Sequence, residues 1–245
     1  MDTTTYAIEA EVEATHWWFQ GRRRLFATEI ARLGLGRDAA ILDIGTSTGT
    51  NLRMLREEGF INVRGLDSSA TAIQFCADKG LGTVVQGDVC DLPFPAGGFD
   101  LVLATDIIEH VEDDQRALAE ITRILKPGGT MLITVPAFQS LWGLQDEVAQ
   151  HKRRYRLQDV LLVVTGSGNR IERDYYFNYL LFLPIWAARQ VIGWLRPPIK
   201  SENEVNNAFI NRLLSWIFAF DIATAPRLRP PFGVSALIVA RKPAP

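Results

Sequence analysis

The sequence predicts an α/β fold, in which helices flank a mostly parallel sheet. Apolar runs typical of buried strands alternate along the chain with segments of helical spacing. The first run, Ala39 to Leu42, leads into a turn of small residues and then a helix from Asn51 to Glu58. The final run, Val234 to Ala240, follows two helix-like segments, Tyr179 to Leu195 and Asn207 to Phe220. We therefore expect a helical insertion before the last strand.

The turn after the first strand is Gly45-Thr46-Ser47-Thr48-Gly49, and Asp43 precedes it. Backbone amides at the start of a helix, beside small side chains, let a nucleotide-like ligand approach closely. A dinucleotide site would need G-x-G-x-x-G, but Ser47 and Thr50 stand where the second and third glycines belong. A hydrolase would use Ser47 as the nucleophile of G-x-S-x-G, but this turn follows the first strand and a long segment follows the last histidine, His151. Both patterns fit poorly, so the later strands must decide the chemistry.

The next three strand-like runs each end near an acid. They are Asn62 to Leu66 before Asp67, Gly82 to Gln86 before Gly87-Asp88-Val89, and Phe99 to Ala104 before Thr105 and Asp106. Asp67 lies close to the spacing of about 20 residues beyond the glycine turn at which an acid reaches ribose hydroxyls. Ligands of open α/β sheets bind outside the carboxyl ends of the strands, so these acids are expected to surround one crevice. Singly, each acid could instead be a solvated strand end or a turn residue.

These motifs resemble those of class I S-adenosylmethionine-dependent methyltransferases of the bacterial small-molecule type. Asp43 followed by Gly45, Ser47 and Gly49 is similar to the first motif of the family, an acid before G-x-G-x-G, with serine replacing the middle glycine. The strings FDLVLATDIIEHVED and ILKPGGTMLITVP look like later motifs. The resemblance covers Arg37 to Pro136 closely and the flanks loosely. It implies a Rossmann-like seven-stranded mostly parallel sheet with an antiparallel last strand and a helical insertion before it.

The resemblance also implies that S-adenosylmethionine is the cofactor and S-adenosylhomocysteine the product. Asp67 would meet the ribose diol, Asp88 the adenine amino group, and the amide of Val89 a ring nitrogen. The predicted cofactor-binding residues are Asp43, Gly45, Thr46, Ser47, Gly49, Asp67, Ser68, Asp88, Val89 and Thr105.

Three histidines, His16, His110 and His151, are the predicted catalytic residues. Methyl transfer is an in-line displacement, and a hydroxyl acceptor must also lose its proton. The pKa of histidine suits a general base near neutral pH, whereas carboxylates such as Asp106 and Glu109 are ordinarily poor bases there. Each histidine could instead be a hydrogen-bonded packing residue.

The predicted substrate-binding residues are Trp17, Trp18, Arg154 and Tyr155. The tryptophans could cover the cofactor or stack on the acceptor, and the alternative is a hydrophobic staple before the following helix. The basic segment Lys152 to Arg156 could hold a carboxylate, phosphate or diphosphate, or be a solvated surface. The strings HWWF and HKRRY resemble methyltransferases that act on saccharides, lipid-linked intermediates or secondary metabolites.

Composition limits the partners. The net charge is −2, with no long basic face, which disfavours a protein that clamps long nucleic acids and favours a small acceptor. The two cysteines, Cys76 and Cys90, lack metal-binding or C-x-x-C spacing, so we expect no metal site and a reducing compartment. The N-terminal segment has no long apolar run and is not a secretory signal, which predicts a cytoplasmic protein.

We predict three units: an N-terminal helical cap at 1–36, the methyltransferase core at 37–176 and 232–245, and a helical insertion at 177–231. The apolar segment Tyr175 to Leu195 is interrupted by polar residues and does not read as a transmembrane helix. It could be ordinary core, an acceptor pocket or homodimer face, or a peripheral contact with the inner face of the membrane.

The sequence thus predicts a methyltransferase that acts on a small acceptor, most naturally by O-methylation. N- or C-methylation is the alternative within enzymes, because these reactions less often need a base. A cofactor-binding partner protein without turnover is the alternative outside enzymes. A serine hydrolase using Ser47 is the remaining and weakest one.

Overall fold

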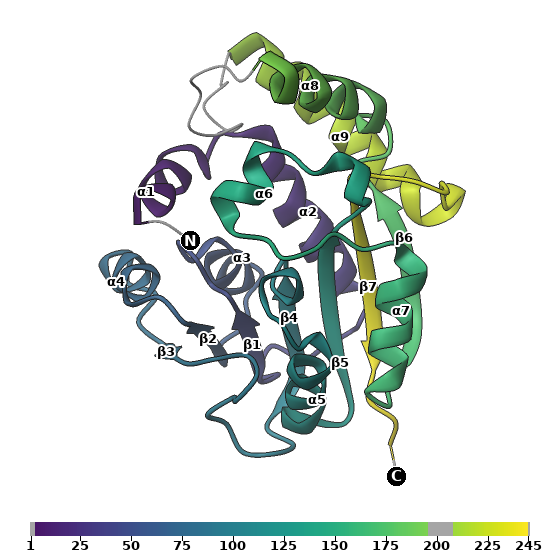
Figure 1. Cartoon of the computed structure of the whole chain (residues 1–245). Coiled ribbons are helices and arrows are strands. Elements are labelled where there is room, and N and C mark those ends of the chain that lie inside the picture. The colour runs from purple at the N-terminus through teal and green to yellow at the C-terminus, as the bar shows by residue number, and fades with distance from the viewer. Residues whose placement is uncertain (1–2, 196–207, 245) are drawn as a thin grey trace.

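The computed structural model describes residues 3–195 and 208–244, in which seven strands form one sheet (Figure 1). The strand order is β3-β2-β1-β4-β5-β7-β6. The bounds are β1 Ile41–Ile44, β2 Val63–Asp67, β3 Val84–Gln86, β4 Phe99–Thr105, β5 Leu125–Pro136, β6 Arg170–Phe177 and β7 Ser235–Arg241. β7 runs antiparallel to both β5 and β6, and the other pairs are parallel. This confirms the predicted fold.

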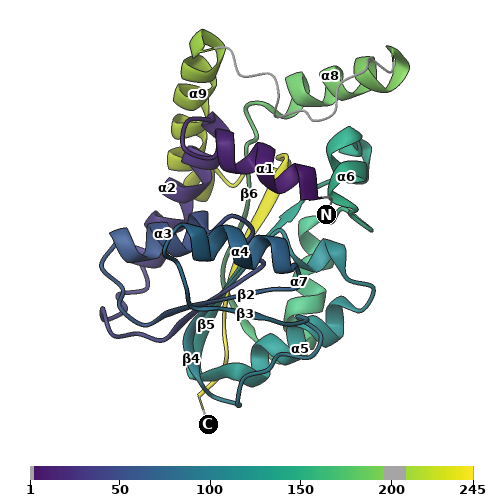
Figure 2. The ribbon, with the colours of Figure 1, turned by 90° about the vertical axis from the view of Figure 1, so that its left-hand side faces the viewer.

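Helices cover the sheet on both faces (Figure 2). On one face lie α5 (Asp114–Ile124) and α7 (Leu157–Gly166). On the other face lie α2 (Trp17–Ala31), α3 (Thr50–Glu57), α4 (Ala70–Asp78) and α9 (Ala208–Leu228). Two helices, α1 (Thr3–Val12) and α6 (Leu144–Ala149), lie above the carboxyl ends of the strands, and α8 (Phe182–Leu195) lies beyond them.

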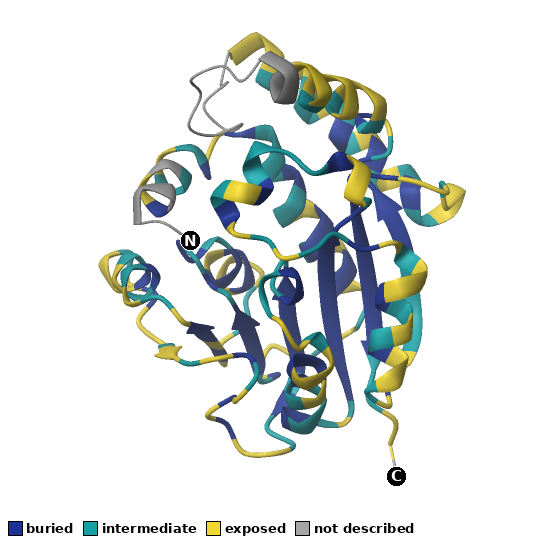
Figure 3. Cartoon of the chain, viewed as in Figure 1, coloured by how far each residue is buried: buried dark blue, intermediate teal, exposed yellow. Residues whose placement is uncertain are grey.

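Burial follows from the sequence pattern. The inner strands are covered on both faces and consist of continuous apolar runs, as expected of parallel strands in such a sheet (Figure 3). On α5, the buried residues Ala117, Leu118, Ile121 and Ile124 recur at helical spacing. Asp113 caps this helix by accepting a hydrogen bond from the amide of Arg116.

The start of β5 includes Lys126-Pro127-Gly128-Gly129, a sequence typical of a turn. The strand already begins at Leu125, which pairs with Phe99 across an irregularity in the register. The glycine pair stays attached to the sheet because Gly128 donates to the carbonyl of Lys242 and Lys242 donates to that of Gly129. These residues are therefore part of strand β5.

Helix α9 of the insertion packs on the N-terminal segment, which the sequence did not predict. Phe218 of α9 stacks on Trp18 at a centroid distance of 5.4 Å and meets Trp17 edge-on at 5.4 Å. Gly21 permits this approach, because a Cβ there would lie 2.1 Å from Cδ1 of Phe218. Asn211 accepts a hydrogen bond from the amide of Trp17 at 2.7 Å. Segments from the two ends of the chain thus share one helical layer.

The outer sides of α8 and α9 expose apolar side chains. They include Leu183 and Trp186 on α8, and Phe209, Leu213, Trp216 and Phe220 on α9. Among the described residues, α9 is the one helix long and apolar enough to cross a membrane, and 17% of its apolar window is buried. One face of α9 is fixed in the fold through Phe218, Asp221 and Ala225. The helix has a buried face and an apolar exposed face.

The Gly21 contact makes a direct test of this shared layer. We expect Gly21→Ala to lower the free energy of unfolding, because the added Cβ would overlap the buried ring of Phe218. Overpacking costs ~1–3 kcal/mol, against about 1 kcal/mol gained from alanine's helix propensity. Urea denaturation should give a lower midpoint, and Phe218→Leu in the same chain should recover part of the loss. Gly82→Ala is the control, since no atom lies within 4 Å of its Cβ. Equal stability of Gly21→Ala and the unmodified chain would contradict the packing.

Candidate active site

The turn between β1 and α3 uses left-handed backbone at three positions. Gly45 has φ 72°, Ser47 φ 48° and Gly49 φ 86°. The positive φ favours glycine at position 45, and a Cβ there would also push the Cδ1 methyl of Ile107, which it would approach to 1.9 Å. Ser47 accepts the positive φ that its side chain disfavours, and its amide donates a 3.0 Å hydrogen bond to Oδ2 of Asp67. The turn is therefore held in place by the acid at the end of β2.

Asp67 links three segments. Its Oδ2 accepts from the amide of Ser47, and its Oδ1 accepts from the amide of Ser69 at 2.9 Å. Burial raises its pKa, and these backbone hydrogen bonds oppose the rise. Each carboxylate oxygen keeps a further lone pair for a ligand.

Asp43 is fully buried at the end of β1. Its Oδ1 accepts from Nδ2 of Asn51 at 3.0 Å, and the same nitrogen donates to Oγ1 of Thr105 at 3.1 Å. Its Oδ2 has no hydrogen-bond partner, and neither has the buried Oγ1 of Thr46. Burial raises the pKa of Asp43 to about 7. Two unsatisfied acceptors therefore lie at the turn, where a ligand with positively charged or donor groups would satisfy them.

The third predicted acid has a local role. Asp88 is exposed, and its Oδ1 accepts from the amide of Cys90 at 2.8 Å within a turn after β3. Val89 beside it is buried. The predicted adenine contact of Asp88 stays a prediction.

Helix α1 lies across the turn and supplies contacts that the sequence did not predict. Glu9 accepts a hydrogen bond from Oγ of Ser47 at 2.8 Å, and Glu13 accepts one from Oγ1 of Thr48. Lys79, which follows the last residue of α4, donates to Glu13 at 2.7 Å and to the carbonyl of Thr48 at 2.8 Å. Only the acidic character of the first helix is visible in the sequence, and nothing there places it over this turn.

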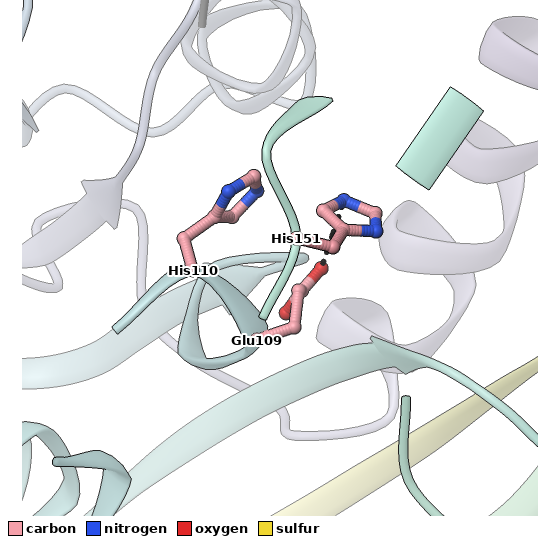
Figure 4. A group of neighbouring side chains, drawn as sticks. All are labelled: Glu109, His110 and His151. Carbon is pink, nitrogen blue, oxygen red and sulfur yellow. Dashed lines mark ion pairs between the residues drawn. The ribbon is translucent and has the colours of Figure 1, made fainter. Parts of the chain in front are cut away.

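The structure brings two of the three predicted histidines together (Figure 4). His110 follows β4 in a short 3-10 helix, η1 (Ile108–His110), and His151 follows α6. Their rings meet edge to face at a centroid distance of 4.7 Å. Glu109 lies beside them, completely buried, with Oε1 3.9 Å from Nε2 of His151. We call Glu109, His110 and His151 the carboxylate–histidine cluster.

The electrostatics of this cluster favour a neutral His110. Burial, followed by the neighbouring His151, lowers the pKa of His110 to about 4. Burial raises the pKa of Glu109 well above its usual range, and Asp106 adds to that rise. Burial alone would also raise the pKa of Asp146, but hydrogen bonds from His151 and Arg154 hold it at about 2. Asp146 is therefore a carboxylate near neutral pH, and it accepts from Nδ1 of His151 at 2.8 Å.

His16 has a different setting. It is buried and caps α2, with Nδ1 accepting from the amide of Trp18 at 3.3 Å. Its ring packs beside Trp17 and Phe19. The predicted catalytic role of His16 stays a prediction, and its observed contacts are those of a helix cap.

Arg154 and Tyr155 support the loop that carries His151. Arg154 donates to Asp146 at 2.8 Å and to the carbonyl of Ala137 at 2.9 Å. The Tyr155 hydroxyl donates to Asp114 at 2.7 Å, and burial raises its pKa. Trp17 and Trp18 likewise pack on Phe218. Acceptor contacts by these four residues stay predictions.

Arg22 and Asp106 belong to the site although the sequence did not single them out as a pair. Arg22 of α2 forms a 2.8 Å ion pair with Asp106, which follows β4 with φ 57°. Its guanidinium also lies over the ring of Trp18, 5.5 Å from the centroid. The run of arginines in α2 indicates that an acidic partner is needed. Asp106 is too distant along the chain for sequence spacing to identify it as the partner of Arg22.

Comparison with known proteins decides the family. Residues 42–133 match the family model described as "Methyltransferase domain". Residues 42–133 are therefore a methyltransferase domain. The matched residues include the turn between β1 and α3, Asp67 and Asp88, and the cluster residues Glu109 and His110. The enzyme class is therefore S-adenosylmethionine-dependent methyl transfer.

Relatives of this methyltransferase domain have diverse names. The rice (Oryza sativa subsp. japonica) "2-methyl-6-phytyl-1,4-hydroquinone methyltransferase 2, chloroplastic" is 32% identical over 111 residues, 43% of this chain and 32% of its own length. The Bos taurus "Probable tRNA methyltransferase 9B" is 31% identical over 125 residues, 50% of this chain and 24% of its own length. The chain thus spans about a third or less of these two proteins.

A solved S-adenosylmethionine-dependent methyltransferase from Archaeoglobus fulgidus shares the fold of nearly the whole chain. The TM-score is 0.58 at 22% identity, covering 90% of this chain and 94% of the other. The residues at the β1 turn fit S-adenosylmethionine, because Asp43 and Thr46 present unsatisfied buried acceptors to a cofactor that carries an ammonium group. When bound, the cofactor supplies the sulfonium methyl group.

The raised pKa of Asp43 predicts pH-dependent cofactor binding. In the free protein Asp43 takes a proton as the pH falls through about 7, and it then no longer attracts an ammonium group. Affinity for S-adenosylhomocysteine should therefore fall by ~10-fold or more between pH 7.5 and pH 5.5, as expected when only the ionised form binds. Titration calorimetry across this range measures the effect. Asp43→Asn should bind weakly with little pH dependence, and an unchanged slope in this variant would contradict the assignment.

Proposed function

We propose that this methyltransferase transfers a methyl group from S-adenosylmethionine to a hydroxyl oxygen of a small molecule. The acceptor classes that we favour are saccharides, lipid-linked intermediates and secondary metabolites. The observation that carries the proposal is the carboxylate–histidine cluster, in which Glu109 is buried and His110 and His151 are half-buried. Glu109 and His110 follow β4 at the sheet edge where β1 also ends, beside the cofactor turn.

The cluster would provide a destination for the proton of the acceptor. In-line displacement at a sulfonium mainly requires that donor and acceptor be held in position, but a hydroxyl must also lose its proton as oxygen attacks. Nδ1 of His151 donates to ionised Asp146, which leaves the lone pair on Nε2 facing Glu109. His151 is therefore the residue best placed to accept the proton, and Asp146 would stabilise the resulting imidazolium.

Other functions have less support. N- or C-methylation less often needs a base, so it would give the Asp146–His151 pair no catalytic role. A binding protein without turnover would give the whole cluster no catalytic role. A hydrolase would need a histidine beside Ser47, but Oγ of Ser47 donates to Glu9 instead. One relative is named for tRNA and another for a quinol, and the net charge of −2 favours a small acceptor over a polyanion.

His151 allows a direct test of the proposal. We expect His151→Ala to lower kcat for methyl transfer to a hydroxyl acceptor by ~10²- to 10⁴-fold, the usual contribution of general base catalysis. Its affinity for S-adenosylhomocysteine should stay within about twofold of the unmodified chain. Lys152→Ala is the matched control, because this neighbour pairs with Glu112 at the surface. Unchanged kcat in His151→Ala with an identified hydroxyl acceptor would contradict the role.

The exposed apolar side chains of α8 and α9 support a peripheral contact with a membrane surface. Phe209 is 78% exposed and Trp216 is 71% exposed, both on the outer side of α9. Aromatic and aliphatic side chains on one side of a helix favour binding in the interfacial region of a bilayer. We propose that the protein is cytoplasmic and touches the membrane through this surface, where a lipid-linked acceptor would be available.

Sedimentation with lipid vesicles tests this contact. The unmodified chain should pellet with the vesicles, and the double substitution Phe209→Ser and Trp216→Ser should abolish most of the pelleting. Leu162→Ser is the control, since Leu162 is 70% exposed on α7 and lies outside this surface. Failure of the unmodified chain to pellet would refute membrane contact, and a dimer that the double substitution dissociates would identify a homodimer face instead.

A further inference from the structure

The carboxylate–histidine cluster has the composition of a metal site. The ligand-capable atoms of Glu109, His110 and His151 lie within 4.8 Å of one another, and the three side chains gather around one point (Figure 4). The residues come from two segments: Glu109 and His110 follow β4, while His151 follows α6. Sequence spacing does not reveal this set, and the sequence-based expectation was that the chain has no metal site.

Each histidine has an outer partner of the kind found around metal ligands. Nδ1 of His151 donates to Asp146 at 2.8 Å, which directs the lone pair of Nε2 toward Glu109, 3.9 Å away. The backbone of Ala149 lies beside the ring of His110 and favours a proton on that ring, although burial outweighs this and lowers the pKa of His110. Metal-binding histidines nearly always donate their second ring N–H to a carboxylate or a backbone carbonyl.

Glu109 supplies an independent observation. Its side chain is 0% exposed, and neither carboxylate oxygen has a hydrogen-bond partner. The other nearby carboxylates are paired, Asp106 with Arg22 and Asp146 with Arg154. A buried ionised carboxylate needs a partner. A proton would satisfy one oxygen of Glu109, whereas a metal ion would satisfy this carboxylate and both imidazole lone pairs at once.

We propose that Glu109, His110 and His151 bind a divalent transition-metal ion of the Zn²⁺ type. Imidazole nitrogen and a single carboxylate suit zinc and its neighbours, whereas magnesium prefers an all-oxygen set. Zinc bonds of about 2.0–2.1 Å place neighbouring ligand atoms roughly 3.3 Å apart, so the side chains must close slightly around the ion. Three protein ligands leave a coordination position open, which is typical of catalytic rather than structural zinc sites.

The catalytic consequence rests on the proposed function, although metal binding itself does not. A hydroxyl acceptor bound at the open position would lose its proton more readily, because the metal lowers the pKa of a coordinated oxygen. The O–H bond breaks and the proton passes to solvent water. The oxygen then attacks the methyl carbon, the carbon–sulfur bond breaks, and S-adenosylhomocysteine leaves. With a metal ion bound, His151 would act as a ligand and solvent water would take the proton; without the ion, His151 would take it as proposed above.

Metal binding to the untagged, chelator-treated full chain tests the proposal. Zn²⁺ would be titrated in calorimetry with a competing chelator, and Co²⁺ would be followed by its visible absorption. We expect one ion per chain, and an intense Co²⁺ spectrum typical of four or five ligands. Glu109→Gln should weaken Zn²⁺ binding by ~100-fold or more, since loss of an outer partner alone costs ~10- to 100-fold. Circular dichroism would verify that this isosteric variant folds, and His110→Gln provides a second ligand variant.

Glu112→Gln is the matched control, because Glu112 is an exposed glutamate in the same segment. Its Zn²⁺ affinity should stay within about twofold of the unmodified chain. The proposal is overturned if the unmodified chain binds no Zn²⁺, or if Glu109→Gln and His110→Gln bind it as tightly. An assay of methyl transfer without added metal separates the two proposals. Activity in a chain that binds no Zn²⁺ would contradict the metal site alone. Zn²⁺ binding without methyl transfer to hydroxyl acceptors would contradict the proposed function alone.

Discussion

The parallel register of the inner strands is the constraint on which the site depends. β1 pairs with β2 on one side and with β4 on the other, and Ile44 lies level with both Leu66 and Ala104. Because the three strands end together, the residues after them meet at one edge. Buried acids therefore crowd a small region, and each must find a donor. The backbone amides of Ser47 and Ser69 satisfy Asp67, while Asp43 and Glu109 keep unsatisfied oxygens for ligands.

Much of this edge could be predicted from the sequence, because it depends on local patterns. Apolar runs locate the strands, and acids that follow them in order locate the crevice. The inserted helices lie where the helix-like segments Tyr179 to Leu195 and Asn207 to Phe220 indicated. α9 continues to Leu228, beyond the expected end at Phe220, because its second half packs on α2 and β6 through Phe218 and Ala225. Such tertiary packing is not encoded in local spacing.

The parts that the sequence did not predict all join segments distant along the chain. Glu9 reaches Ser47, and Arg22 reaches Asp106. His151 and His110 were both recognised as candidates, but only the fold shows that they adjoin Glu109 and that Asp146 orients one of them. Charge and residue type identify these side chains as candidate site residues. Which residues they contact depends on how the fold brings distant loops together.

The central claim is that this edge of the sheet binds S-adenosylmethionine and that Asp67 organises it. Calorimetric titration of the intact chain with S-adenosylhomocysteine, beside Asp67→Ala, tests it most directly. The account predicts binding of one molecule per chain, weakened by ~10-fold or more in Asp67→Ala, because loss of hydrogen bonds to a charged acceptor costs ~1.5–3 kcal/mol. Asp78→Ala, an exposed acid on α4, should bind normally. No binding by the unmodified chain, or equal binding by Asp67→Ala, would contradict the account.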